Sequence, residues 1–418
     1  MDTLSEVDDK KARLLFWGED LALSHVVRPL ALADAVRDKY EIIFVTGERY
    51  AHLVEGYGLT PRTTWTLSTD TFMERLSKGR DGWLAEEISR QVKDELALIE
   101  ELSPDLIIGD LRWSLGVSAE LTKTPYVSLI DAYWGPYCTL PPPTPEFPFV
   151  KVLGVKLSSL LMPLLAPTIF KQLAKPFNAV RREYGLKELA EYREVTTHAD
   201  WVVYPDLPAL APTENRPDNH RYLGPVQWSP TSEHPPWWDQ LPSDKPLIYV
   251  AMGSTGRVGV VDSLIAVLGE MPVTVMLSTS GRLSDKDYPS NFYTTDYLPG
   301  MEACERSSLV ICNGGAGTVY QAIAGETPIL GIPTNADQYY VIDALTRQGA
   351  GLYIRSTHVS KRGISAAVER LLTERRFVER ISELNRALSL FNAADRFVDV
   401  IESALNANKR KFAIQQDG

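Results

Sequence analysis

The sequence predicts an α/β protein with more than one domain. Near its start, an apolar run at residues 14–17, a helical pattern at 26–39 and a second apolar run at 42–45 follow one another. A strand, a helix and a strand at this spacing are typical of a βαβ unit with a parallel sheet. A chain of 418 residues is long enough for two or three domains with sizeable hydrophobic cores.

The rest of the N-terminal half continues this alternation. The predicted elements are a strand at residues 105–109 that ends at Asp110, a helix at 113–123, a strand at 126–130 and strongly apolar helices over 156–180. Residues 205–246 are rich in Pro, Asp, Asn and Trp and show no sustained periodicity. This composition indicates a connection between two domains.

The C-terminal half shows the same alternation of strands and helices. Strands are predicted at residues 247–251, 273–278, 292–296, 309–312 and 329–332, and helices at 262–268, 319–324, 359–372, 374–390 and 395–405. Residues 406–418 are polar, and we expect them to fray.

A glycine-rich loop follows the apolar run at 309–312. Its residues are Asn313, Gly314, Gly315, Ala316 and Gly317, and Thr318 stands where the next helix is expected to begin. Glycines between a strand and a helix let backbone N–H groups approach an anion, and the positive end of the helix dipole favours negative charge there. The loop therefore suggests a diphosphate site. An ordinary strand–helix turn also uses glycine, and these residues alone leave both interpretations open.

Positions beyond the loop extend the pattern to a recognisable signature. They are Gly314, Gly315, Gly317, Thr318, Gly325, Pro328, Pro333, Asp337 and Gln338, preceded by Tyr297, Leu298 and Pro299. This arrangement resembles the donor-binding segment of family 1, UDP-glycosyltransferase-like enzymes of the bacterial macrolide and antibiotic type. The resemblance implies that the loop holds a donor diphosphate. It also implies that Asp337 and Gln338 hold the donor sugar and that Tyr297 and Leu298 receive the base.

The resemblance further implies the GT-B fold, an α/β architecture of two Rossmann-like domains that face each other across a cleft. Residues 1–220 would form the N-terminal acceptor-binding domain, and residues 221–390 the C-terminal donor-binding domain. A C-terminal helix at 391–410 would pack back on the first domain. Gly253 and Ser254, which follow the strand at 247–251, would lie near the donor phosphate.

Two positions of the donor segment depart from the family pattern. Asn313 stands where the family usually has a histidine that contacts the diphosphate, and Gln321 stands where many members have a glutamate that binds ribose hydroxyls. An asparagine can donate a hydrogen bond to phosphate but carries no charge. A glutamine can bond a hydroxyl without the added strength of a carboxylate.

The same resemblance, more loosely matched, assigns roles in the N-terminal half. His25 occupies the position of the family's catalytic histidine, and Asp110 that of its aspartate partner. The alternative interpretation is a histidine near a helix N-cap and a helix-capping aspartate. Asp131, Tyr133 and Trp134 follow a strand end and are candidates to line an acceptor cleft. A packed turn is the equally weighted alternative for these three.

Composition limits the partners and the compartment. The formal net charge of −11 argues against general nucleic-acid binding, which requires basic surfaces. Cys138, Cys304 and Cys312 have neither metal-ligand spacing nor an even count for disulfides, so no metal site is expected. The first thirteen residues lack the apolar core of a signal peptide. These observations favour a cytoplasmic protein.

The most apolar stretch, residues 150–170, contains Lys151, Lys156, Pro163 and Pro167. A spanning helix needs about 20 mainly apolar residues, so we expect no transmembrane helix here. Helices that cover the acceptor cleft are the preferred interpretation, because the resembled family has them at this place. A peripheral membrane contact for a lipid acceptor is the alternative.

The function that the resemblance implies is an inverting transfer of a hexose from a UDP- or dTDP-sugar to a hydroxyl of a small-molecule or lipid acceptor. The nucleotide sugar is a co-substrate, and no cofactor or metal is expected. Two alternatives are a nucleotide-sugar epimerase on a similar scaffold and a non-catalytic nucleotide-sugar-binding or activator protein.

Overall fold

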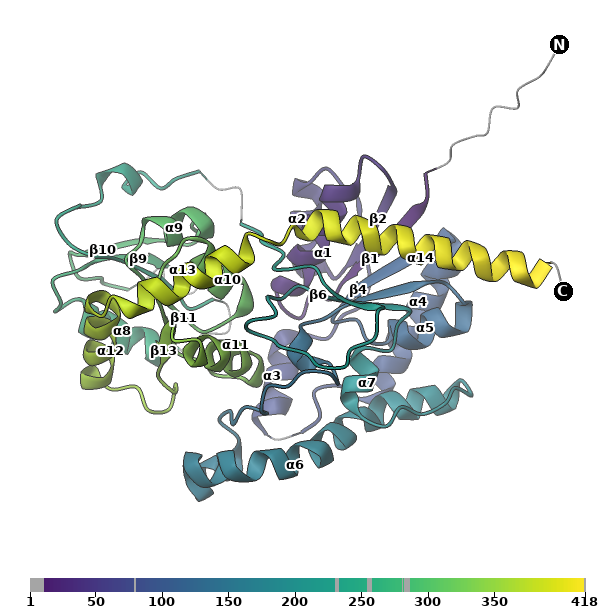
Figure 1. The fold of residues 1–418 in the computed structure, drawn as a ribbon, viewed down its shortest axis with the longest axis horizontal. Helices are drawn as coiled ribbons and strands as arrows, with labels where there is room; N and C mark the ends of the chain where they lie inside the picture. Colours follow the sequence, from purple (N-terminus) through teal and green to yellow (C-terminus); the bar gives the residue numbers. More distant parts are fainter. Residues whose placement is uncertain are drawn as a thin grey trace, which may run out of the picture.

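A computed structural model describes residues 11–416, except residues 79, 230–232, 254–257, 280 and 282–285. Within this range the chain folds into two α/β domains, which Figure 1 shows side by side. The N-terminal domain is built on a seven-stranded sheet and the C-terminal domain on a six-stranded sheet. Every recorded strand pair in both sheets is parallel.

The first sheet has the strand order β3-β2-β1-β4-β5-β6-β7. Its strands are β1 (Arg13–Gly18), β2 (Glu41–Thr46), β3 (Pro61–Thr63), β4 (Leu106–Asp110), β5 (Tyr126–Leu129), β6 (Trp201–Tyr204) and β7 (His220–Tyr222). The order reverses between β1 and β4, where Gly18 lies opposite Asp110. β7 still belongs to this sheet, so the sheet continues past the expected domain boundary at residue 220.

Helices cover both faces of this sheet, as expected for parallel strands. They are α1 (Ser24–Val36), α2 (Ala51–Gly56), α3 (Thr69–Ser77), α4 (Ala85–Leu102), α5 (Leu115–Thr122), α6 (Pro148–Glu183) and α7 (Tyr192–Thr196). Sequence analysis placed no element between β2 and β4, although β3, α2, α3 and α4 lie there. α4 is rich in charged residues, and few apolar side chains, such as Ile88 and Val92, mark its buried face.

The second sheet has the order β10-β9-β8-β11-β12-β13, which again reverses beside its first strand. Its strands are β8 (Leu247–Ala251), β9 (Thr274–Ser278), β10 (Phe292–Thr295), β11 (Leu309–Cys312), β12 (Ile329–Gly331) and β13 (Gly351–Tyr353). Its helices are α8 (Val258–Leu268), α9 (Gly300–Arg306), α10 (Ala316–Ala324), α11 (Ala336–Arg347), α12 (Lys361–Thr373) and α13 (Arg376–Leu388). Both sheets therefore have the strand order of Rossmann folds.

The last helix, α14 (Ala393–Gln416), lies along the N-terminal domain in Figure 1. The side chain of Phe397 is fully buried in the same core cluster as Leu14 and Phe16, and its ring lies 6.0 Å from that of Phe16. The expectation of a frayed tail from residue 406 was wrong, because the helix continues to Gln416.

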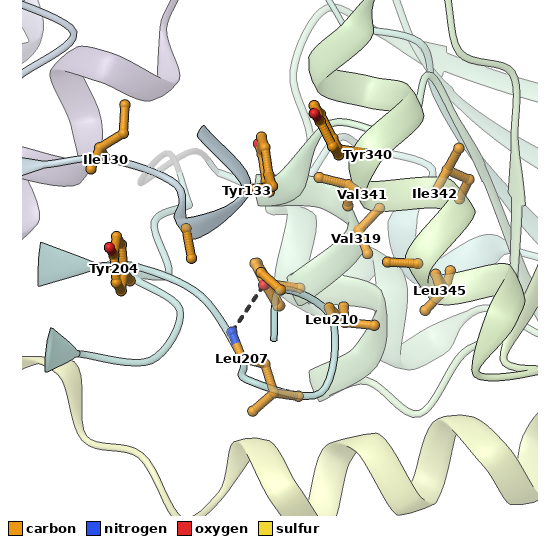
Figure 2. Packing of buried hydrophobic residues seen from close by; sticks show 14 of the residues in the cluster. Ile130, Tyr133, Tyr204, Leu207, Leu210, Val319, Tyr340, Val341, Ile342 and Leu345 are labelled. Atoms are coloured by element: carbon orange, nitrogen blue, oxygen red, sulfur yellow. Dashed lines mark hydrogen bonds between the residues drawn. The ribbon is translucent and has the colours of Figure 1, made fainter. Parts of the chain in front are cut away.

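A hydrophobic cluster joins the two domains, as Figure 2 shows. The ring of Tyr133 from the N-terminal domain stacks on that of Tyr340 from α11, with 5.0 Å between centroids. The hydroxyl of Tyr320 in α10 accepts from the backbone N–H of Leu207 and donates to Asp206 Oδ1, each at 3.0 Å. Tyr133 follows the end of β5 and Tyr340 follows the end of β12, so the carboxyl edges of the two sheets face each other.

α6 is kinked at Gly154, whose φ of 76° and ψ of 161° are not helical, so it consists of two helical segments. The expected helices over 156–180 form the second segment, which contains Pro163, Pro167 and Pro176. By length and composition, its span from Phe149 to Glu183 is long and apolar enough to cross a membrane. Sequence analysis had expected no transmembrane helix here because of the lysines and prolines. Only 22% of its most apolar window is buried, so α6 is not a core helix.

Candidate active site

The candidate active site lies where the two sheets change strand order. In open parallel sheets, ligands bind outside the carboxyl ends of the strands at such a switch point. The first switch point, between β1 and β4, carries Asp110 with His25 beside it. The second, between β8 and β11, carries Gly253 and Asn313. Because the carboxyl edges face each other, residues from both domains come together at this boundary.

His25 and Asp110 form a hydrogen-bonded pair. His25 is the second residue of α1, and its Nδ1 lies 2.7 Å from Asp110 Oδ1. A carboxylate only accepts hydrogen bonds, so the shorter contact assigns the proton to Nδ1 and leaves Nε2 as an acceptor. Arg28 Nη2 also lies 3.1 Å from Nδ1, but in this assignment it donates to Asp110 Oδ1 instead. The side chain of Asp110 is 1% exposed, whereas that of His25 is 19% exposed. The imidazole can therefore reach a substrate that Asp110 cannot touch.

Arg28, one turn along α1 from His25, binds both oxygens of Asp110. Its Nε donates to Oδ2 and its Nη2 to Oδ1, each at 2.9 Å, and its Nη1 donates to Asp131 Oδ1 at 2.7 Å. Burial lowers the pKa of Arg28, but the two carboxylates outweigh burial and raise the pKa well above its ordinary value. Arg28 therefore stays charged and holds the Asp110 carboxylate in one orientation. Sequence analysis missed this residue, although its spacing of three from His25 places both on one helix face.

A buried ion-pair cluster supports the ends of β1 and β4. Arg112 donates from Nε to Glu95 at 2.6 Å and from Nη1 to Glu19 at 2.8 Å, and all three side chains are fully buried. Burial raises the pKa of Glu19 to about 7 against the attraction of Arg112. Between Asp110 and Arg112, Leu111 has a φ of 58°, a left-handed conformation that is uncommon outside glycine. On either side of this turn, Asp110 pairs with Arg28 and Arg112 pairs with Glu95.

The three acceptor-cleft candidates all lie at this boundary, where Asp131 and Tyr133 are buried and Trp134 is partly buried. Asp131 is buried and paired with Arg28, while Tyr133 Oη and Trp134 Nε1 donate to Oδ1 of Asp337, at 2.8 and 3.1 Å. Burial raises the pKa of Asp131 above its ordinary value, and the charge of Asp337 raises it further. The charges of Arg28 and His25 lower this pKa without cancelling the effect of burial. The structure therefore brings the predicted sugar ligand of one domain close to the predicted dyad of the other.

The glycine-rich loop turns sharply between β11 and α10. Gly314 has a φ of 84°, and a Cβ on it would lie 3.2 Å from both the Gln338 carbonyl and the Ile342 side chain. Both facts require glycine. Asn313 Oδ1 accepts the N–H of Gly315 at 3.1 Å. α10 begins at Ala316, so the N–H groups of its first turn, which includes Gly317 and Thr318, are orphan donors at the positive end of the helix.

Other predicted donor residues fall into different environments. Leu298 is buried, whereas Tyr297 is 57% exposed. Gln321 donates to the carbonyl of Trp228 at 2.7 Å, toward the interdomain connection. The buried Gln338 accepts from Thr334 through its amide oxygen and so holds the turn between β12 and α11.

Gly253 has a φ of 62°, and a Cβ on it would lie 3.2 Å from the Asn313 amide nitrogen, so the ends of β8 and β11 meet closely. Ser254 lies outside the described residues. In the described part of the chain, no group of three or more His, Cys, Asp or Glu side chains is arranged to hold a metal ion.

Relatives agree with this architecture. Residues 264–397 match the model of the glycosyltransferase family 28 C-terminal domain. Over 398 residues the chain is 37% identical to the PGL/p-HBAD biosynthesis glycosyltransferase of Mycobacterium tuberculosis, an alignment that covers 95% of this chain and 92% of that protein. It is 36% identical over 377 residues to the PGL/p-HBAD biosynthesis rhamnosyltransferase of Mycobacterium bovis, covering 90% of this chain and 84% of the relative.

The fold also matches solved structures. The spinosyn rhamnosyltransferase SpnG complexed with thymidine diphosphate superposes with a TM-score of 0.66 at 17% identity, and the match covers 93% of this chain and all of that one. The expected α/β architecture is thereby confirmed. With close relatives along nearly its whole length and two facing Rossmann-like domains, the chain belongs to the bacterial, family 1-like glycosyltransferases of GT-B fold and is a glycosyltransferase.

Proposed function

We propose that this enzyme transfers a hexose from a UDP- or dTDP-sugar to an acceptor hydroxyl with inversion at the anomeric carbon. The observation that carries the proposal is the His25–Asp110 pair, which Arg28 holds in place. Both this pair and Asp337 of the other domain act electrostatically on Asp131, so they lie near one another. A positioned base and a sugar ligand from opposite domains suit a reaction between two substrates in one cleft.

In this proposal His25 Nε2 takes the proton of the acceptor hydroxyl. The acceptor oxygen attacks the anomeric carbon as the bond from that carbon to the diphosphate oxygen breaks. One in-line displacement inverts the configuration. Asp110 keeps the imidazole in the required tautomer and stabilises the imidazolium that forms. The electron pair leaves with the diphosphate. The N-terminus of α10 and the side chain of Asn313 stabilise its negative charge.

The names of the relatives support a substrate class within this proposal. Two of them are named for PGL/p-HBAD biosynthesis and one of these is a rhamnosyltransferase, while the solved SpnG structure contains thymidine diphosphate. We therefore place a dTDP-hexose first among donors and a UDP-hexose second. The acceptor is a hydroxyl-bearing small molecule or lipid, and the reaction takes place in the cytoplasm. The proposal requires no cofactor besides the nucleotide sugar.

A turnover assay with UDP- and dTDP-sugars and a panel of hydroxyl acceptors tests the proposal. Mass spectrometry should detect a glycosylated acceptor together with the released nucleoside diphosphate, and NMR should show the inverted anomeric configuration. Isomerisation of the donor in the absence of acceptor would instead indicate an epimerase. Tight donor binding without turnover over the whole panel would indicate a non-catalytic binding protein. Retained configuration in the product would contradict the single displacement.

A further inference from the structure

α6 exposes several large apolar side chains on both sides of its kink at Gly154. The apolar face of α6 consists of Val152, Leu153, Leu157, Leu160, Leu164 and Leu165. Three of these side chains are more than two thirds exposed, Val152 at 84%, Leu164 at 76% and Leu160 at 72%. Most of the large hydrophobic residues that are exposed in the described part of the chain lie on this one helix. Scattered surface leucines need no explanation, but a contiguous apolar face of this kind marks an interaction site.

The opposite side of α6 is fastened to the N-terminal domain. Met162, Ala166, Phe170 and Ala174 recur at a spacing of four and are all buried, and Phe177 continues the same stripe. The Phe177 ring lies 6.2 Å from that of Trp113, in an edge-on contact. α6 therefore has two different faces, and its outward face is not a part of the domain core.

Charge on α6 differs from charge on the rest of the protein. From residue 148 to residue 180 the only charged residues are Lys151, Lys156, Lys171 and Lys175, and all four are exposed. The whole chain has a formal net charge of −11. Over residues 148–180, an exposed apolar face flanked only by lysines is complementary to an apolar surface bordered by negative charge.

We propose that the apolar face of α6 docks on an anionic phospholipid bilayer, with the helix lying in the plane of the interface. The leucines enter the boundary between head groups and acyl chains, and the lysines contact lipid phosphates. A spanning orientation would pull the buried stripe around Phe170 and Phe177 out of the domain, so α6 binds the membrane without crossing it. This inference goes beyond the proposed function and does not depend on it.

The docked helix would hold the domain boundary near the bilayer. Just before α6, Glu146 accepts from Tyr339 Oη at 2.8 Å and lies 3.2 Å from Arg355 Nε, and both partners belong to the C-terminal domain. The apolar face follows within the first turns of α6. The membrane-bound face would therefore lie next to the boundary between the two domains.

Co-sedimentation of the full chain with lipid vesicles tests the proposal. One vesicle contains equal parts of phosphatidylglycerol and phosphatidylcholine, and the other contains phosphatidylcholine alone. The parent should partition at least about tenfold more strongly onto the anionic vesicle at about 0.05 M salt, and this preference should shrink at about 0.5 M salt. A double variant, Leu160→Gln with Leu164→Gln, should lower partitioning at least about tenfold. Lys151→Gln with Lys156→Gln should lower it about tenfold on the anionic vesicle only.

A matched control lies on the other domain. Val378→Gln with Leu390→Gln removes two exposed apolar side chains, 45% and 74% exposed, without touching α6, and should leave partitioning unchanged. Equal partitioning of the α6 variants and the parent would overturn the proposal, as would absence of parental binding to the anionic vesicle. Light scattering gives a third test. If the parent is a dimer that Leu160→Gln with Leu164→Gln dissociates, a second copy of the chain covers this face and the proposal is overturned. Turnover of a water-soluble acceptor reports on the proposed function separately.

Discussion

Asp337 Oδ1 lies 2.8 Å from the phenolic oxygen of Tyr133, although the two residues are 204 positions apart in the sequence and belong to different domains. Trp134 donates to the same oxygen at 3.1 Å. A carboxylate has about four acceptor positions, so Oδ2 remains available for sugar hydroxyls. In the proposed function, a sugar bound by Asp337 would lie beside Tyr133 and Trp134, at the boundary with the N-terminal domain.

The first prediction concerns this contact. Asp337→Ala should weaken binding of a nucleotide sugar much more than binding of the free nucleoside diphosphate, because only the former presents hydroxyls to the carboxylate. Tyr133→Phe should change sugar-nucleotide affinity up to about tenfold through loss of one hydrogen bond that orients Asp337. Calorimetric titration of both ligands measures these effects. Tyr339→Phe, which removes a comparable interdomain bond to Glu146, is the control and should leave both affinities unchanged. Equal losses for the two ligands in Asp337→Ala would remove Asp337 from the sugar site.

The second prediction concerns Asn313. Its Oδ1 holds the Gly315 N–H, so replacement acts on the loop as well as on the diphosphate. Asn313→Ala should cost about 0.5–1.5 kcal/mol of nucleoside diphosphate binding, and up to about 3 kcal/mol if the phosphate charge is fully felt. Asn313→Asp keeps the acceptor for Gly315 but adds a negative charge, and should bind more weakly than the Ala variant. Asn313→His should be tolerated. Unchanged affinity in the Ala and Asp variants would mean that the backbone alone anchors the loop.

The third prediction concerns the proposed base. His25→Ala should reduce turnover about 10²–10⁴-fold while donor affinity stays nearly constant, because a positioned base acts on the chemical step. Asp110→Asn should lower turnover less in the same direction. His198→Ala is the matched control, since His198 lies on the surface beside Glu120 and its loss should leave turnover unchanged. Parental turnover in His25→Ala would remove the dyad from the mechanism.

The fourth prediction concerns Arg28 as a positioning residue. Arg28→Ala removes the guanidinium that pairs with two buried carboxylates, Asp110 and Asp131, and should destabilise the fold by about 3–5 kcal/mol. Arg28→Lys keeps the charge but cannot bind both oxygens of Asp110 at once. The Lys variant should therefore recover most of the thermal stability while kcat stays low and donor KM stays near the parental value. Full recovery of kcat together with stability would reduce Arg28 to a structural role.

The fifth prediction concerns acid stability. His220 Nδ1 lies 2.7 Å from Tyr204 Oη, and burial lowers the pKa of His220 from 6.5 to about 4. The folded state thus disfavours the imidazolium, so the free energy of unfolding is fully present above pH 6.5 and falls as pH drops toward 4. The loss is at most about 3 kcal/mol, less where solvent screens the ring. Urea unfolding of His220→Gln should show a flatter pH dependence than the parent in this window. Identical slopes for His220→Gln and the parent would contradict the assignment.

Much of the architecture was predictable from sequence, because burial in a parallel sheet demands uninterrupted apolar runs. Residues 309–312 and 247–251 became β11 and β8 for this reason. The helix after the glycine-rich loop ends at Gly325 as predicted. One prediction was wrong where a local rule met tertiary contacts, because α14 continues beyond residue 405. Pro163 and Pro167, cited in the sequence analysis against a transmembrane span, lie inside α6. α6 keeps its course because the buried side chains around Phe170 hold it against the domain.

By itself, the sequence determined the alternation of strands and helices and the turn at the glycine-rich loop, since these depend on periodicity and on backbone conformations that glycine adopts easily, while the GT-B fold followed from the family resemblance. The tertiary structure alone decided which charges meet. Strand order brings Asp110 beside His25, the helix face brings Arg28 onto Asp110, and domain packing brings Asp337 to Tyr133. It also decided which side of α6 stays exposed. Contacts between residues far apart in the chain depend on how strands and domains assemble, and a local sequence pattern does not predict that assembly.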